Sequence, residues 1–183
     1  VRDENDTIRW DGVQRQVAAW NADQNMRSAI RSSTVWFYQE LARRIGEERM
    51  QRYITRAHYG NEDISGGIDL FWLEGGLRIS PCQQIAFLRK LYDGDLPFSP
   101  ATIQTVKDIL VLERTNEYVL RGKTGWAARP EHQTGWFVGY LERGRDVYFF
   151  ANCIDIRKDE DARARIEITR SILQSLGLME RPE

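Results

Sequence analysis

The sequence predicts an α+β domain in which helices cover both faces of an antiparallel sheet. Helical periodicity dominates the first part of the chain, and three strand candidates follow it before a last amphipathic segment. The strand candidates are apolar at odd and even positions alike, as in Trp136, Phe137 and Val138, so both faces of the sheet should be covered. Helices segregated around an antiparallel sheet define the α+β class.

Apolar spacing predicts three helices near the start of the chain. Positions 10, 13, 17 and 20 predict a short amphipathic helix, and a stripe over 35–45 predicts a second helix that ends near Gly46. The segment from Glu47 to Arg56 predicts a third. The glycine-containing stretch after His58 is expected to be a loop.

Two serine–proline pairs open the next helices. Ser80 is the expected N-cap, with Pro81 at the first helical position and Gln83 completing a capping box, and this helix should end near Gly94. Ser99-Pro100 repeats the pattern. Strands are predicted over 118–121, 135–141 and 147–156, with a turn at 144 joining the last two. The tail up to 176 predicts an amphipathic helix before a glycine stop.

Composition excludes several functional classes. The 183 residues carry 26 Lys and Arg against 27 Asp and Glu, which argues against a nucleic-acid binder. No run of about 18 apolar residues predicts a membrane span. Two cysteines, Cys82 and Cys153, and two histidines are too few for a disulfide framework or a dedicated metal centre, so we expect no metal and two buried free thiols. We expect one domain over residues 1–183.

The segment Lys123-Thr124-Gly125-Trp126 stands at the end of a predicted strand. A cation, a hydroxyl and a glycine without a side chain could receive an anionic substrate against exposed backbone. The alternative is that Lys123 is a solvated strand-end lysine. Lys-Thr-Gly is also one of the motifs of serine enzymes that react with penicillins.

Three further segments carry a functional and a structural interpretation. Ser33-Thr34-Val35 stands at a helix start, where Ser33 could be an N-cap or a proton-relaying hydroxyl beside a dry wall formed by Val35. Tyr59-Gly60-Asn61 could be a plain loop or an edge of a site. The aromatic stretch over 67–75 could fill a core or line a pocket.

Together and in this order, these motifs resemble the class D serine β-lactamases, the oxacillinase type. The matching segments are Ser33-x-Val35, Tyr59-Gly60-Asn61, Trp72-Leu73-Glu74-Gly75, Lys123-Thr124-Gly125-Trp126 and Phe149-Phe150-Ala151-Asn152. The resemblance covers nearly the whole chain. It implies a periplasmic or secreted enzyme that hydrolyses β-lactam antibiotics through an acyl-serine. It implies no cofactor other than carbon dioxide, held as a lysine carbamate, and it leaves a homodimer open.

The resemblance also implies roles for individual residues. Ser33 would pass a proton between the nucleophile and Lys123. Lys123, Thr124 and Arg165 would hold the substrate carboxylate, with Arg157, Arg163 and Arg170 as alternatives to Arg165. The strand through Gly125 would pair with the substrate amide, and the backbone N–H of Trp126 would supply half of an oxyanion hole. Trp72 would hydrogen-bond the carboxylated lysine, the general base, in a pocket kept dry by Val35 and Leu73.

One departure from the resemblance is severe. The nucleophile and the lysine of these enzymes share a Ser-x-x-Lys motif, and none of the eight serines of this chain has a lysine three positions later. We expect the chain to be the carboxyl-terminal part of a longer domain, completed by an amino-terminal segment and inactive alone. A natural remnant without catalysis is the other interpretation. A penicillin-binding sensor domain of a membrane receptor, acylated without turnover, is the alternative function.

Overall fold

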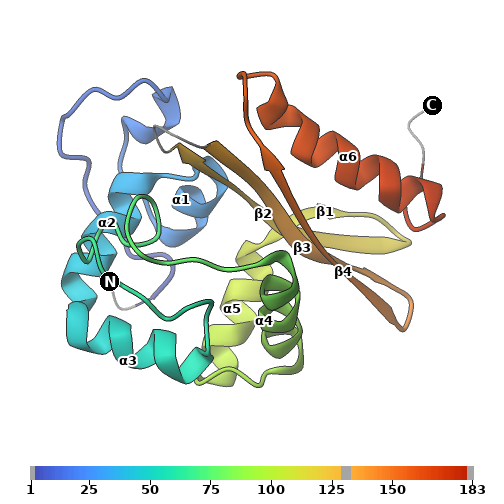
Figure 1. Cartoon of the computed structure of the whole chain (residues 1–183), viewed down its shortest axis with the longest axis horizontal. Helices are drawn as coiled ribbons and strands as arrows, with labels where there is room; N and C mark the ends of the chain where they lie inside the picture. Colours follow the sequence, from blue (N-terminus) through green and yellow to red (C-terminus); the bar gives the residue numbers. More distant parts are fainter. Residues whose placement is uncertain (1–2, 129–132, 181–183) are drawn as a thin grey trace.

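The computed structural model describes residues 3–128 and 133–180 and consists of a helical lobe beside an antiparallel sheet (Figure 1). The strand order is β1-β2-β3-β4, and every neighbouring pair is antiparallel. The strands are β1 (Val111–Arg114), β2 (Tyr118–Ala128), β3 (Gln133–Arg143) and β4 (Asp146–Asp155). β4 is the last strand, so its outer edge has no partner strand within 3–128 and 133–180.

Helices lie on both sides of this sheet. They are α1 (Met26–Ser32), α2 (Val35–Ile45), α3 (Glu47–Ala57), α4 (Pro81–Asp93), α5 (Pro100–Ile109) and α6 (Asp161–Ser175). α4 and α5 lie on the side of the helical lobe, whereas α6 crosses the opposite face (Figure 1). The predicted α+β class with a sheet covered on both faces is therefore confirmed.

Apolar residues of the sheet join these layers. Leu120 and Leu141 are fully buried in a cluster that includes Leu173 of α6. On the other side, a cluster around Leu88 and Leu91 of α4 packs against half-buried side chains of the sheet. The alternation of side chains along each strand lets one sheet serve both clusters.

The predicted helix starts are confirmed in detail. The Ser80 side chain accepts from the Gln83 backbone N–H while the Gln83 side chain accepts from the Ser80 backbone N–H, a full capping box. Ser99 caps α5 through the backbone N–H of Thr102. Each cap satisfies backbone donors that a helix amino terminus leaves unpaired.

The helix predicted over 10–20 is wrong. Only a single 3-10 turn, η1 (Ala18–Trp20), occurs there. The Asp11 carboxylate accepts from the backbone N–H of Val13 and pairs with Arg15, and these local bonds compete with a helix. The helix α1 and the strand β1 were not predicted, because seven and four residues are too few to establish a periodic apolar pattern.

Two further expectations need correction. Lys123 does not stand at a strand end, because β2 continues to Ala128 and pairs with β3 along its whole length. The thiols of Cys82 and Cys153 are free, but both residues are exposed rather than buried. Cys82 lies in the first turn of α4, and Cys153 lies near the end of edge strand β4. No helix in the described part of the chain is long and apolar enough to cross a membrane.

Candidate active site

The second half of β2 offers an open backbone edge. β1 pairs with β2 only at Val119, Leu120 and Arg121, and one more backbone bond joins Gly122 to Leu110. On its other side β2 stays paired with β3 as far as Ala128. The outer edge over 123–127 therefore faces no strand among the described residues. An extended polar group of a ligand could hydrogen-bond there as an added strand would.

Lys123 projects from this half-open segment into buried surroundings. Its Nζ donates to Ser33 Oγ at 2.5 Å and to the Thr124 carbonyl oxygen at 2.8 Å. Because an ammonium carries three hydrogens, one donor remains available. Burial, and secondarily the positive charge of Arg165, lowers the pKa of Lys123 to about 8. Lys123 makes no ion pair with any described carboxylate.

Arg165 of α6 supplies a second, half-buried cation beside Lys123. Its Nε and Nη1 atoms are buried and have no hydrogen-bond partner within 3–128 and 133–180. Burial lowers the pKa of this guanidinium. Among the alternatives from the sequence, Arg170 pairs with Glu113, whereas Arg157 and Arg163 are exposed. Lys123 and the buried nitrogens of Arg165 have no carboxylate partner among the described residues, so this part of the site suits a bound anion.

Ser33 lies at the junction of α1 and α2. It is the C-cap of α1 in the left-handed conformation (φ 50°, ψ 45°), so its interpretation as an N-cap of the next helix is wrong. Thr34 holds the N-cap position of α2 instead. The Trp20 indole donates to the Ser32 carbonyl oxygen, which fixes this junction. A non-glycine residue in this conformation is held by its surroundings, and here it aims the hydroxyl at Lys123.

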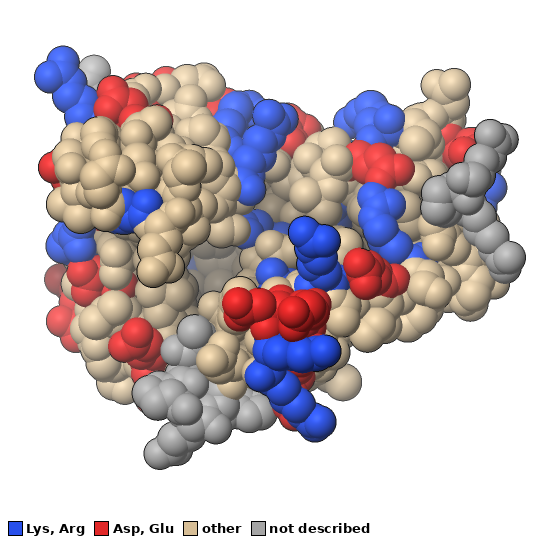
Figure 2. All heavy atoms as spheres, turned by 90° about the horizontal axis from the view of Figure 1, so that it is seen from above, with Lys and Arg blue, Asp and Glu red and all other residues tan. Residues whose placement is uncertain are grey.

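A cavity of about 1110 Å³ lies over the second half of β2 and extends across the sheet to Trp136 of β3 and Cys153 of β4. Of the residues singled out in the sequence, its walls contain Tyr59, Trp72, Leu73, Lys123, Thr124, Gly125 and Trp126. Ser33, Val35 and Arg165 do not line it, and Ser33 is linked to it through Lys123. From above, the molecule is hollowed between the helical lobe and the part that carries α6, and both basic and acidic side chains border the hollow (Figure 2).

The loop between α3 and α4 brings Trp72 and Leu73 to this cavity. Asn61 fixes the loop, because its side chain donates to the Gly76 carbonyl oxygen and accepts from the Arg78 backbone N–H. Gly60 approaches Arg78 so closely that an added Cβ would lie 2.1 Å from the Arg78 carbonyl oxygen. Tyr59-Gly60-Asn61 is thus an edge of the site held by backbone contacts. The Trp72 indole N–H has no partner among the described residues.

Several lining residues were missed by the sequence reasoning. Trp136 pairs with Gly125 in the β2–β3 register and lines the cavity, as do Thr134 and Cys153. If the strand that contains Lys123-Thr124-Gly125 had been aligned with the next predicted strand as an antiparallel pair, Trp136 could have been identified as a neighbour of Gly125. Gln133 accepts a hydrogen bond from the Trp126 indole at 2.9 Å, although Trp126 is 41% exposed. Within the described residues no cluster of His, Cys, Asp and Glu could hold a metal ion.

Comparison with known proteins adds three findings. Residues 1–174 match the family described as penicillin binding protein transpeptidase domain. The chain is 44% identical over 174 residues to β-lactamase OXA-48 of Klebsiella pneumoniae, covering 95% of this chain and 66% of that protein. A crystal structure of the class D β-lactamase YbXI from Nostoc superposes with a TM-score of 0.95 at 55% identity, covering 98% of this chain and 76% of that one.

A third relative is a regulatory protein. The chain is 43% identical over 172 residues to the regulatory protein BlaR1 of Bacillus licheniformis, covering 93% of this chain but 28% of that protein. The chain thus spans slightly less than two thirds of the length of the curated β-lactamase and a smaller share of the regulatory protein.

Proposed function

This chain belongs to the class D β-lactamases within the penicillin binding protein transpeptidase domain family, and on that premise we propose that the protein containing it hydrolyses β-lactam antibiotics. One observation carries the proposal. Lys123 of the half-open strand β2 and the half-buried Arg165 beside it are cations without a carboxylate partner among the described residues. Penicillins carry a carboxylate and an amide, and these two groups match the cation pair and the strand edge.

The substrate-holding steps follow from these groups. Lys123, Thr124 and Arg165 bind the carboxylate, and the backbone from Lys123 through Gly125 pairs with the substrate amide. The backbone N–H of Trp126 stabilises the oxyanion that develops on the attacked carbonyl. One such donor is typically worth about 2.7–4 kcal/mol of barrier.

Ser33 transfers the proton between the nucleophile and Lys123 in this proposal. The contact at 2.5 Å and the pKa of about 8 for Lys123 support that role, because a lysine with a lowered pKa exchanges protons near neutral pH. A carboxylated lysine, formed with carbon dioxide, would supply the general base. Trp72 suits its support, since its indole N–H is unpaired, and Leu73 and Val35 would help to exclude water.

The nucleophile and the base lysine are assigned to a segment outside the 183 residues, because this chain has no Ser-x-x-Lys. The chain is then the carboxyl-terminal part of one domain and is inactive alone. We further propose that the complete protein is periplasmic or secreted.

Nitrocefin hydrolysis by the full-length protein tests the enzymatic function. We expect many turnovers per protein molecule, and none from residues 1–183 alone. The relative BlaR1 favours one alternative, a penicillin-binding sensor domain. A single stoichiometric burst without recovery would establish that alternative. Absence of any acylation by a fluorescent penicillin would contradict both functions. The remaining interpretation would then be that the chain is a natural remnant of such an enzyme and does not catalyse a reaction.

A further inference from the structure

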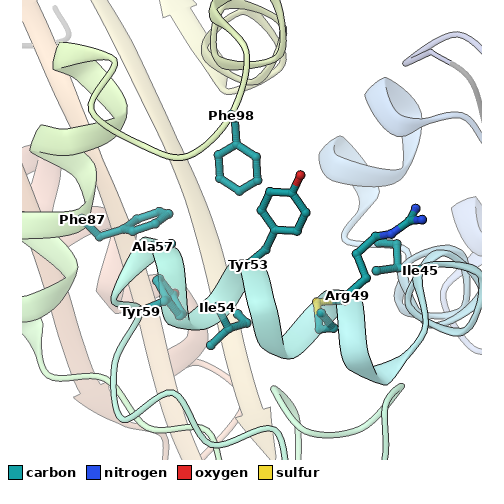
Figure 3. A pocket seen from close by; sticks show the side chains of 9 residues that line it. Ile45, Arg49, Tyr53, Ile54, Ala57, Tyr59, Phe87 and Phe98 are labelled. Carbon is teal, nitrogen blue, oxygen red and sulfur yellow. The ribbon is translucent and has the colours of Figure 1, made fainter.

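The helical side of the candidate site borders a second, apolar cavity. This cavity has a volume of about 500 Å³ and lies between α3, α4 and the loop that precedes α5 (Figure 3). We call it the α3 groove because α3 supplies five of its lining residues: Arg49, Met50, Tyr53, Ile54 and Ala57. Tyr59 lines both this groove and the larger cavity. The sheet side is built differently, because hydrogen bonds between β4 and α6 converge on the backbone of Arg165.

The buried nitrogens of the Arg165 guanidinium, Nε and Nη1, make no hydrogen bond among the residues that the structure describes. A long arginine side chain has many rotamers, so without such bonds its direction depends on its backbone and on the packing of its stem. A guanidinium is a planar fork that binds a carboxylate well only in the correct orientation. The groups that fix the backbone and the stem of Arg165 therefore bear on what it can bind.

Asn152 of β4 fixes the backbone of Arg165. Its side-chain Nδ2 donates to the Arg165 carbonyl oxygen at 3.1 Å and to Thr169 Oγ1 at 3.1 Å. Thr169 Oγ1 donates to the same carbonyl oxygen at 2.8 Å, and Thr169 is buried. The two hydrogens of the Asn152 amide thus each have an acceptor on α6. This cluster joins one turn of α6 to the sheet at the residue that carries the guanidinium.

The position of this cluster along α6 gives it weight. The carboxyl half of α6 is anchored by Leu173, which lies in an apolar cluster with Leu120 and Leu141. Arg165 lies eight positions before Leu173, about 12 Å along the helix. Apolar contacts are not directional, whereas hydrogen bonds are. The Asn152 amide therefore fixes the rotation and the height of the amino half of α6 more narrowly than the apolar anchor does.

Gly135 of β3 determines the path of the Arg165 stem. A Cβ added at Gly135 would lie 3.4 Å from Arg165 Cδ and 2.6 Å from Ile156 Cδ1, so the stem passes over this glycine beside Ile156. Gly135 pairs with Trp126 of β2 in the sheet register. The stem thus leads from α6 across β3 towards the half-open strand β2. With its backbone held by Asn152, the guanidinium has one defined approach to the site.

We propose that Asn152 is a positioning residue for carboxylate binding by Arg165. This inference rests on the proposed function, in which Lys123, Thr124 and Arg165 bind the substrate carboxylate. Asn152 is not among the residues that line the cavity over β2, so it acts through α6. Removing its amide frees the amino half of α6 to shift on the sheet, and the guanidinium then meets the carboxylate less well. A residue that only stabilised the fold would change the amount of folded protein and not the preference for a carboxylate.

The test compares benzylpenicillin with its methyl ester, which lacks the carboxylate charge. The carboxylate selectivity is kcat/KM for the acid divided by kcat/KM for the ester, measured on the full-length protein. Asn152→Leu keeps the branched shape of asparagine and removes its donors. We expect the selectivity to fall about 3- to 10-fold, which is part of what complete loss of a charge-assisted hydrogen bond would cause. Because the ratio cancels the fraction of folded protein, a less stable variant still gives a valid value.

Two further variants serve as controls. Ser175→Ala removes a hydrogen bond of 2.8 Å from the Ser175 hydroxyl to the Ile172 carbonyl oxygen, at the other end of α6, and should leave the selectivity unchanged. Arg165→Met should lower the selectivity by itself. Adding Asn152→Leu to Arg165→Met should then change the selectivity by less than about twofold, because the group that Asn152 positions is gone.

An unchanged selectivity in Asn152→Leu would overturn the proposal, as would an equal fall in the Arg165→Met background. If the unmodified protein hydrolyses neither compound, the proposed function fails on its own. Calorimetric titration with benzylpenicilloate, the ring-opened anion, then decides the positioning role. Weaker binding by Asn152→Leu than by the unmodified protein would support that role, and equal binding or no binding by either would overturn it.

Discussion

The two walls of the candidate site differ in how much of each this chain supplies. On the sheet side, β2 and β3 pair along their full length and hold Lys123 next to Arg165 in buried surroundings. On the helical side, α3 presents an apolar stripe to an open groove, and no Ser-x-x-Lys is available. The sheet side therefore supplies groups that suit substrate binding, whereas the proposed function assigns the nucleophile to a segment outside the 183 residues. A mutation on one wall should therefore have effects of a different kind from a mutation on the other.

The largest effect is expected from Lys123→Met in the full-length protein. Removing one partner of a charge pair with a substrate carboxylate costs about 2–5 kcal/mol, so kcat/KM for benzylpenicillin should fall by roughly 30- to 5,000-fold. Steady-state hydrolysis measures this change. An unchanged kcat/KM would remove Lys123 from carboxylate binding.

The same variant should not be destabilised. The pKa of Lys123 is lowered on folding to about 8, so below that pH its charge opposes folding, and methionine removes this cost. Urea unfolding at pH 7 should give a free energy of unfolding that is equal or higher. A clear decrease in the free energy of unfolding would mean that the fall in kcat/KM results from disruption of the sheet and not from loss of carboxylate binding.

Gly60→Ala tests the other wall and should act on stability. A Cβ at this position would lie 2.1 Å from the Arg78 carbonyl oxygen, and φ is +60°. Gly12→Ala is the matched control, because Gly12 also has a positive φ (+80°) but no atom within 4 Å of the added Cβ. We expect Gly60→Ala to lower the free energy of unfolding by about 1–3 kcal/mol more than Gly12→Ala does. Equal decreases in the free energy of unfolding for the two variants would show that the loop between α3 and α4 accommodates the added Cβ at position 60.

The smallest effect is a pH dependence on the sheet side. With a pKa of about 8, the protonated fraction of Lys123 falls from roughly 0.9 at pH 7 to 0.1 at pH 9. Protonated Lys123 attracts the carboxylate, so kcat/KM should decrease about tenfold over this range and stay constant below it. Lys123→Arg should abolish the decrease, because a guanidinium stays charged. A profile of the unmodified protein that is flat to pH 9 would contradict the proposed pKa and role.

Local patterns made much of this fold predictable. Ser80-Pro81 and Ser99-Pro100 specify helix starts through their own side chains, and the structure has both. The helix expected over 10–20 failed because Asp11 makes local hydrogen bonds that apolar spacing does not reveal. The exposure of Cys153 also escaped prediction, since it depends on β4 being the last strand of the sheet.

The site was predictable only in part, for a related reason. The motif at Lys123 was recognisable from adjacent residues, and its resemblance to a family indicated Ser33 and Arg165. The left-handed conformation of Ser33 and the missing counterion of Arg165 arise from tertiary packing. Trp136 depends on strand register, and the α3 groove depends on which surfaces remain uncovered. None of these can be read from neighbours in sequence.

The hydrogen bond between Ser33 and Lys123 joins residues 90 positions apart in the chain. In kinetic terms, closing so long a loop costs entropy before the contact repays it, whereas the β3–β4 hairpin pairs near neighbours and forms readily. We therefore expect the hairpin to pair before Ser33 meets Lys123, because that contact requires the helical lobe and the sheet to be docked. The contact between hydroxyl and ammonium thus distinguishes a chain whose layers are docked from one that has only its local helices and hairpins.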